Sequence, residues 1–215
     1  MSDKLQIDFV SDVVCPWCII GLKQLERALE VTGTEAEIRF HPFELNPQMA
    51  PGGENLREHL AAKYGTTPEG SRQARERLTA LGDELGFAFS YADDMRMVNT
   101  FRAHQLIHWA DTLGRGPDLK MALFKAFFTD NHDLNDVDVL VENAAEIGLD
   151  PEEARAVLED GRFADAVRQE EQLWVSRGIQ GVPAVILNQR YLVSGAQGVD
   201  NFSAIVKQVS EEQAA

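Results

Sequence analysis

The chain has 215 residues, of which 44% are hydrophobic and 26% charged, proportions that are ordinary for a globular protein. Its formal net charge of −15 argues against nucleic acids and anionic membrane surfaces as partners. No apolar run approaches membrane-spanning length, and Met1–Leu5 lacks the basic and apolar regions of a signal peptide, so we expect a cytoplasmic protein.

The first predicted elements are a strand, a helix and a second strand. Leu5–Val10 has the pattern of a strand, and apolar residues at helical spacing follow Pro16. Gly33 ends this helix, because glycine tolerates the left-handed conformation after a helix. Ala36–His41 alternates apolar and polar residues, which is typical of a strand, and we expect Pro42 to end it.

Residues 49–161 carry an almost entirely helical pattern after a short linker rich in proline and glycine. Thr67-Pro68 and Asp150-Pro151 mark two starts clearly, because each combines an N-cap residue with proline at the first helical position. The helices predicted here cover Asn55–Tyr64, Pro68–Leu85, Thr100–Leu113 with Asn99 as its cap, Pro117–Phe127, Asp138–Ile147 and a last one from Pro151.

Strand signals return near the C-terminus. A helix over Phe163–Arg177 is followed by two strands, Ala184–Leu187 and Tyr191–Val193, joined by a tight turn at Asn188-Gln189. A last amphipathic helix is capped by Asp200 or Asn201. This order predicts an α/β protein with a thioredoxin fold (βαβ–ββα) and an all-helical domain inserted in its middle. We expect residues 1–48 and 162–215 to form the thioredoxin-fold domain and residues 49–161 the insertion.

The two cysteines of the chain, Cys15 and Cys18, lie between the first strand and the first helix. A C-x-x-C pair at this place is typical of a thioredoxin-type dithiol site. Pro16 suits the first helical turn, and the positive end of the helix dipole favours a thiolate at Cys15. We therefore predict Cys15 as the nucleophile and Cys18 as the resolving thiol.

Two other interpretations of the cysteine pair are weaker. A zinc site needs more ligands, and of the five histidines only His104 and His108 have i, i+4 spacing, so we expect no metal. A structural disulfide is also conceivable, but so short a loop constrains the unfolded chain little. Redox chemistry is favoured.

Four sequence blocks together resemble the DsbA-like oxidoreductases of the thioredoxin superfamily, over almost the whole chain. The likeness is greatest to the FrnE-like branch, which is related to hydroxychromene-carboxylate isomerases and kappa-class glutathione transferases. The blocks are Ser11-Asp12-Val13-Val14-Cys15-Pro16-Trp17-Cys18 with Gly21, Pro42–Pro47, Asn99–His104, and Gly181-Val182-Pro183 with Tyr191–Gln197.

The resemblance implies that Val182-Pro183 is a cis-proline pair facing the dithiol. In that case the backbone of Val182 can pair with an extended substrate segment. We place Trp17 and His104 with Val182 and Pro183 among the residues that contact substrate. For His104 the alternative is a buried helix histidine bonded to its neighbours, which burial tendencies favour. Asp12 precedes the dithiol and either tunes its pKa or relays a proton to Cys18; the alternative is a solvent-facing loop carboxylate.

The resemblance also helps to distinguish dithiol–disulfide exchange from the glutathione-dependent reactions of the related enzymes. The isomerase and transferase relatives usually carry serine where this chain has Cys15, so two cysteines favour dithiol–disulfide exchange on a protein or small-molecule thiol or disulfide. Trp17 stands where DsbA has histidine, which implies a milder reduction potential than that of DsbA. We expect no tightly bound cofactor, glutathione as a candidate co-substrate, and a monomer or homodimer. A glutathione-dependent isomerase or transferase and a non-catalytic peptide-binding module remain alternatives.

Overall fold

The computed structural model describes residues 4–214, which divide into two compact units. The sheet unit contains the chain up to Leu45 and from Glu170 onward, and the helical unit comprises Asn46–Gln169. The chain passes between the units twice, and the second boundary, between Gln169 and Glu170, falls inside the helix Ala164–Ser176 (α8). The boundaries expected after residues 48 and 161 remain a prediction about independently folding domains.

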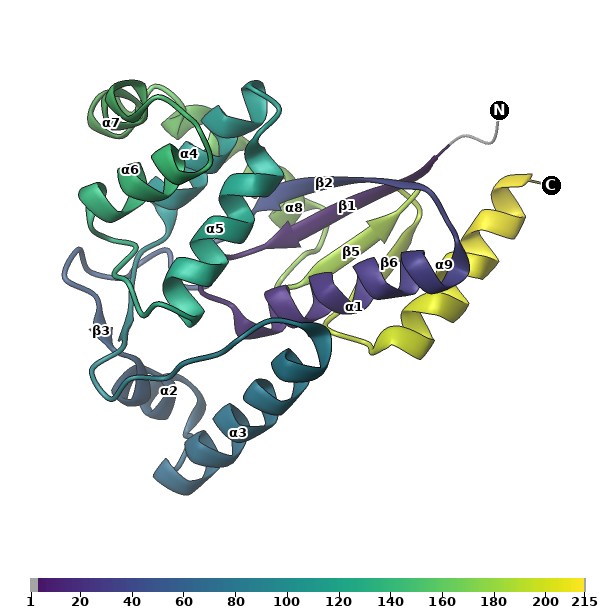
Figure 1. Cartoon of the computed structure of the whole chain (residues 1–215), viewed down its shortest axis with the longest axis horizontal. Coiled ribbons are helices and arrows are strands. Elements are labelled where there is room, and N and C mark those ends of the chain that lie inside the picture. The colour runs from purple at the N-terminus through teal and green to yellow at the C-terminus, as the bar shows by residue number, and fades with distance from the viewer. Residues whose placement is uncertain (1–3, 215) are drawn as a thin grey trace. The chain divides into compact units, whose positions relative to one another are not determined.

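The sheet unit is built around a four-stranded sheet with the order β2-β1-β5-β6. Strands β1 and β2 are parallel, and the other neighbours are antiparallel. Two helices, α1 and α9, lie along one face of the sheet, and α8 lies on the other (Figure 1). The bounds are β1 Leu5–Ser11, α1 Pro16–Thr32, β2 Ala36–Pro42, β5 Ala184–Leu187, β6 Tyr191–Ser194 and α9 Val199–Ala214. The predicted α/β thioredoxin fold is confirmed in this order of elements.

The two faces of the sheet follow from the alternation of side chains along β1. Val10 belongs to a buried cluster with Trp174 of α8 and with Ala184 and Ile186 of β5. The residues of opposite parity, such as the fully buried Phe9, point to the face that α1 and α9 cover. The sheet therefore has an apolar layer on each side.

Backbone conformations confirm two predicted chain reversals. Gly33 has φ 65°, and its N–H donates to the carbonyl of Glu30 at the end of α1. Asn188 and Gln189 have φ 49° and 54°, left-handed values, in the three-residue connection between β5 and β6, across which Leu187 pairs with Tyr191. Pro42 is the last residue of β2 and lies on an edge strand, where proline is tolerated.

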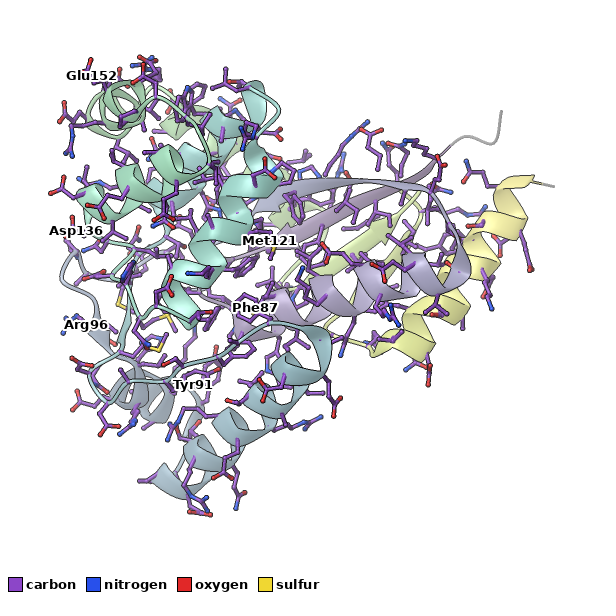
Figure 2. The ribbon with its side chains drawn as sticks, in the orientation of Figure 1. Phe87, Tyr91, Arg96, Met121, Asp136 and Glu152 are labelled. Carbon is purple, nitrogen blue, oxygen red and sulfur yellow. The ribbon has the colours of Figure 1, made fainter. Side chains whose placement is uncertain are left out.

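The helical unit contains most of the predicted helices, with bounds shifted by one or two residues. Thr67 caps α3 by accepting from the N–H of Gly70 at 3.1 Å, and Asp150 caps α7 by accepting from that of Glu152 at 2.9 Å. Asp136 and Glu152 lie at the N-terminal ends of α6 and α7 (Figure 2). The helices are α2 Leu56–Tyr64, α3 Pro68–Leu85, α4 Phe101–Thr112, α5 Gly116–Phe128, α6 Val137–Glu146 and α7 Pro151–Asp160.

Three details of the sequence prediction are wrong. The insertion is not all helical, because β3 (Glu54–Asn55) pairs with β4 (Arg96–Met97), and strands of two residues are too short to show a period. Thr100, not Asn99, is the N-cap residue of α4, although the side chain of Asn99 accepts from the N–H of Phe101. Helix α9 begins at Val199, so Asp200 and Asn201 lie inside its first turn.

An aromatic cluster orders the segment between α3 and β4 in the helical unit. The ring of Phe89 lies 5.0 Å from that of Phe87, 5.3 Å from that of Phe128 and 5.8 Å from that of Tyr91. Phe87 and Tyr91 are labelled on this segment in Figure 2. Among the described residues no helix combines the length and the apolar character that crossing a membrane requires.

Candidate active site

The candidate site begins where β1 gives way to α1. Cys15 is the N-cap residue of α1, with extended backbone angles, and Pro16 occupies the first helical position as predicted. The N–H of Cys15 donates to the carbonyl of Asp12 at 3.1 Å, which closes a tight turn between strand and helix. No acidic residue lies in the first turn of α1, so the partial positive charge of the helix end is directed at Cys15 without a neutralising neighbour in that turn.

The two thiols differ in burial. Cys15 is 4% exposed and Cys18 is fully buried, and both are free thiols. Burial raises the pKa of the Cys18 thiol well above its ordinary value, and a hydrogen bond to Cys15 and the negative charge of Cys15 raise this pKa further. Cys18 is therefore held as a neutral thiol beside Cys15.

The loop before β5 completes the surroundings of Cys15. The Val182-Pro183 peptide bond is cis, as the resemblance implied. The thiol of Cys15 donates to the carbonyl oxygen of Val182 across 3.7 Å, a distance within the range for sulfur. The loop and the start of α1 are therefore neighbours although 167 residues separate them in the sequence.

Gly21 lets α1 approach this loop closely. A Cβ atom at position 21 would lie 3.1 Å from Cγ of Pro183 and 3.6 Å from Cα of Ala196. Gly21 is among the residues that carry the family resemblance, but its packing role could not be seen from the sequence. The spacing from Cys18 to Gly21 places the glycine one helical turn along the same face of α1.

Asp12 is a functional candidate whose surroundings sequence reasoning left open. Its side chain is fully buried, so the expectation that it might face solvent is wrong. One carboxylate oxygen of Asp12 accepts from the N–H of Leu45 at 2.8 Å, which ties the dithiol turn to the segment after β2. The charge of Asp12 also raises the pKa of Cys18, as the smallest of the contributions.

The remaining predicted residues lie in different surroundings. Trp17 is 37% exposed and follows directly on the proline of the dithiol motif. His104 belongs to α4 in the helical unit. Its side chain is buried, and its backbone N–H donates to the carbonyl of Thr100 at 2.9 Å. The roles given to Trp17 and His104 in substrate contact stay predictions.

A cavity of about 310 Å³ opens beside the cis-proline loop in the sheet unit. It is lined by the loop from Gly178 to Ala184 and by Leu192, Ser194 and Gly195. Val182, whose carbonyl oxygen accepts from the thiol of Cys15, belongs to this lining, whereas Cys15 itself does not. Among residues 4–214, no group of three or more His, Cys, Asp or Glu side chains is arranged to hold a metal ion.

A family model and a curated relative match nearly the whole chain. The model described as "DSBA-like thioredoxin domain" matches residues 6–207. The uncharacterized protein YwbO of Bacillus subtilis is 27% identical over 210 residues, which cover 97% of this chain and 98% of YwbO.

Solved structures with the same fold include two oxidoreductases. The crystal structure of a probable DsbA oxidoreductase from Streptomyces coelicolor is 35% identical with a TM-score of 0.91, and the match covers 97% of this chain and 91% of that one. The cytosolic disulfide reductase DsbM of Pseudomonas aeruginosa, solved with GSH, is 20% identical with a TM-score of 0.66, covering 96% and 99% of the two chains. At this identity the likeness to DsbM concerns the fold alone.

Proposed function

We propose that this chain, which belongs to the DsbA-like thioredoxin domain family, is a thiol–disulfide oxidoreductase of FrnE type that works through the Cys15-Pro16-Trp17-Cys18 dithiol. One observation carries the proposal. The thiol of Cys15 stands at the N-terminal end of α1 within hydrogen-bonding reach of the Val182 carbonyl, with the buried Cys18 one helical turn behind it.

The exchange runs in two balanced steps. The thiolate of Cys15 attacks a substrate disulfide; the Cys15–substrate bond forms, the substrate S–S bond breaks, and the leaving sulfur takes up a proton. Cys18 then loses its proton and attacks the sulfur of Cys15, which releases the second substrate thiol. The substrate is reduced by two electrons and the protein is oxidised to the Cys15–Cys18 disulfide. In the oxidising direction the same steps run backwards.

The raised pKa of Cys18 suits its role as the resolving thiol in the second step. While Cys15 is a free thiolate, its negative charge keeps the proton on Cys18. When Cys15 enters a mixed disulfide that charge disappears, and one of the causes that hold the proton is removed. Cys18 therefore becomes easier to deprotonate at the stage at which its thiolate is needed.

We further propose that substrate lies against Trp17, the backbone of Val182, and Pro183. The substrates are thiols or disulfides of proteins or small molecules, and glutathione acts as co-substrate rather than as a tightly bound cofactor. Binding of GSH by DsbM, which shares the fold, supports glutathione. We infer that the protein is cytoplasmic and that it is a monomer or a homodimer.

Trapping of the mixed disulfide tests this proposal. Cys18→Ser leaves the attacking sulfur and removes the resolving one, so one half of oxidised glutathione or of a disulfide peptide should remain bound to Cys15 as a mixed disulfide while the other half leaves as a thiol, and mass spectrometry should detect the adduct. Cys15→Ser is the matched control and should accumulate none, because Cys18 is buried. An adduct on Cys18 instead of Cys15 contradicts the assignment.

A glutathione-dependent isomerase is the second candidate. The structure of a 2-hydroxychromene-2-carboxylate isomerase shares the fold with a TM-score of 0.70. This chemistry would need only the sulfur of glutathione held near Cys15. Glutathione-dependent turnover that survives in Cys18→Ser would favour the isomerase over the oxidoreductase.

A further inference from the structure

A second cavity lies on the face of the sheet that α8 covers, in the same unit as the dithiol. Its volume is about 410 Å³. Asp8, Ile186 and Leu192 stand side by side across β1, β5 and β6 in the sheet register, and all three line the cavity. Trp174 and Ile179, both buried, complete an apolar floor.

This cavity adjoins the one beside the cis-proline loop. Ile179 and Leu192 line both of them. The strand residues that line the two cavities face the same side of the sheet, because side chains two positions apart on a strand point the same way. The first cavity is lined by the paired residues Ala184 and Ser194, and the second by the next pair of the same face, Ile186 and Leu192. We call the joined depression the substrate groove; it runs from Val182 toward the turn between β5 and β6.

Two arginines stand over the far end of this groove. The guanidinium of Arg177 lies 4.9 Å from the ring centroid of Trp174, and that of Arg190 lies 5.1 Å from the ring centroid of Tyr191. Both side chains line the cavity and are exposed. Over the part of the chain that the structure describes, neither guanidinium is within 4.0 Å of a carboxylate.

Each acidic group near this end has a hydrogen-bond partner of its own. The ring of His41 lies between two of them, with Nε2 at 2.8 Å from a carboxylate oxygen of Asp8 on the groove wall and Nδ1 at 2.5 Å from a carboxylate oxygen of Glu170. The hydroxyl of Tyr191 donates to Glu212; this hydrogen bond lowers the pKa of Glu212, and the positive charge of Arg190 lowers it further, so Glu212 is within electrostatic reach of Arg190. In a chain with 35 acidic and 20 basic residues, Arg177 and Arg190 thus bring two positive charges to one end of the groove.

The strand at the rim of the groove is open to an extended partner. Strand β6 is the last strand of the sheet order, and its residues Tyr191–Ser194 include no charged side chain. Leu192 on this strand is 52% exposed. Natural edge strands usually carry charges or proline that block pairing, so an uncharged edge beside a reactive site suits strand addition.

We propose that the substrate groove binds the peptide segment beside the reacting cysteine of a disulfide substrate, and that Arg177 and Arg190 select segments that carry a carboxylate. The proposal rests on the proposed function and names its substrate class. The row of Ile186 and Leu192 is four residues along the strand from Val182, about 13 Å at the rise of a β-strand. An extended peptide therefore places its acidic side chain about four or five residues from the cysteine.

Three synthetic peptides of otherwise identical sequence test this inference. Each carries one cysteine in a disulfide with a reporter thiol, and glutamate, glutamine or lysine four residues away. The reduced protein should favour the glutamate peptide over the lysine peptide by about tenfold in kcat/KM at low salt, and the preference should shrink in high salt. The double variant Arg177→Glu, Arg190→Glu should abolish or reverse the preference, and it should change the rate of the glutamine peptide less than that of the glutamate peptide.

A second double variant controls for total charge. Arg27 and Arg39 are exposed on the sheet unit and do not line the groove, so Arg27→Glu, Arg39→Glu makes the same change in net charge. It should keep the preference for glutamate. Equal rates for the three peptides with the wild-type protein, or an equal loss in both double variants, would overturn the proposal.

Binding without exchange separates this inference from the proposed function. Fluorescently labelled peptides with serine in place of cysteine cannot react, so anisotropy measures occupation of the groove alone. Tighter binding of the glutamate peptide by the wild-type protein, lost in Arg177→Glu, Arg190→Glu, supports the groove even if no peptide exchanges its disulfide. Equal binding of all three peptides contradicts it, whatever the exchange activity.

Discussion

The two ends of the substrate groove differ in how their functional groups are held. At the dithiol end, Cys18 and Asp12 are fully buried, and Gly21 brings α1 against Pro183. At the arginine end, Arg177 and Arg190 are exposed and rest on the rings of Trp174 and Tyr191. One end depends on buried groups with fixed partners, and the other on flexible charges at the surface.

This difference separates the residues that exchange sulfur from the residues that select the substrate. Sulfur exchange needs the attacking and resolving atoms in a fixed relation, which burial and close packing provide. Recognition of a charged side chain tolerates movement, because Coulomb attraction acts over several ångströms and is screened by salt. Changes at the dithiol end should therefore affect every substrate, whereas changes at the arginine end should affect only charged ones.

The largest effect is expected from Cys15→Ser. Loss of the attacking sulfur should lower exchange with the glutamate, glutamine and lysine peptides alike by at least about a thousandfold, or about 4 kcal/mol in transition-state free energy. The measurement is the release rate of the reporter thiol. A variant that lost only the glutamate peptide would place the chemistry at the wrong end of the groove.

Asp12→Ala should cost the next largest amount. It removes a fully buried carboxylate and leaves the N–H of Leu45 without this acceptor, so we expect a loss of about 1–3 kcal/mol in the free energy of unfolding. Urea denaturation measures this loss. Asp12→Asn keeps an acceptor oxygen and should recover most of the stability; a full loss in Asp12→Asn would show that the charge, not the hydrogen bond, is what stabilises the turn.

The raised pKa of Cys18 predicts a pH dependence of stability. The folded reduced protein holds the Cys18 proton more tightly than the unfolded chain, so this contribution is fully present below the thiol pKa of the unfolded chain, about 8.5. As the pH rises beyond that value, the reduced protein should lose up to about 1.4 kcal/mol per pH unit until Cys18 ionises in the folded state.

Urea denaturation of the reduced protein between pH 7 and about pH 10 tests this dependence, with Cys18→Ala as the matched variant. The difference in unfolding free energy between the two proteins should be flat up to about pH 8 and then decline. A difference that is independent of pH would mean that Cys18 ionises equally well in the folded and unfolded states.

The smallest effect is expected at the arginine end. Arg177→Ala and Arg190→Ala remove exposed side chains without an ion-pair partner among the described residues, so the unfolding free energy should change by no more than about 0.5 kcal/mol each. Thermal and urea denaturation provide the measurement. A loss as large as that of Asp12→Ala would show that the arginines hold the sheet unit together.

The sequence predicted what local patterns encode. Pro16 and Gly33 delimit α1, Thr67 and Asp150 cap their helices, and Asn188-Gln189 forms the hairpin turn, because each signal acts within a few residues. The contact between Cys15 and Val182 joins residues far apart in the sequence, so local patterns could not predict it; it was expected only because the family resemblance implied that Val182-Pro183 faces the dithiol.

The remaining features depend on which segments meet in the folded chain. The burial of Asp12 follows from the approach of Leu45, which lies 33 residues further on. Arg177 and Arg190 meet at one cavity only because α8 and the turn between β5 and β6 border the same face of the sheet. Neither feature produces a period or a motif in the sequence, so neither could be predicted from it.

Equilibration of the protein in glutathione buffers of graded ratio tests the central claim most directly. Thiol counting and tryptophan fluorescence should report one two-electron transition between the dithiol and the Cys15–Cys18 disulfide. Because Trp17 replaces the histidine of DsbA, the reduction potential should lie between about −270 and −180 mV, the range of reductases and isomerases. The transition should vanish in Cys15→Ser. Two thiols that titrate independently, or a wild-type protein that stays fully reduced at every ratio, would contradict the assignment of an exchanging dithiol.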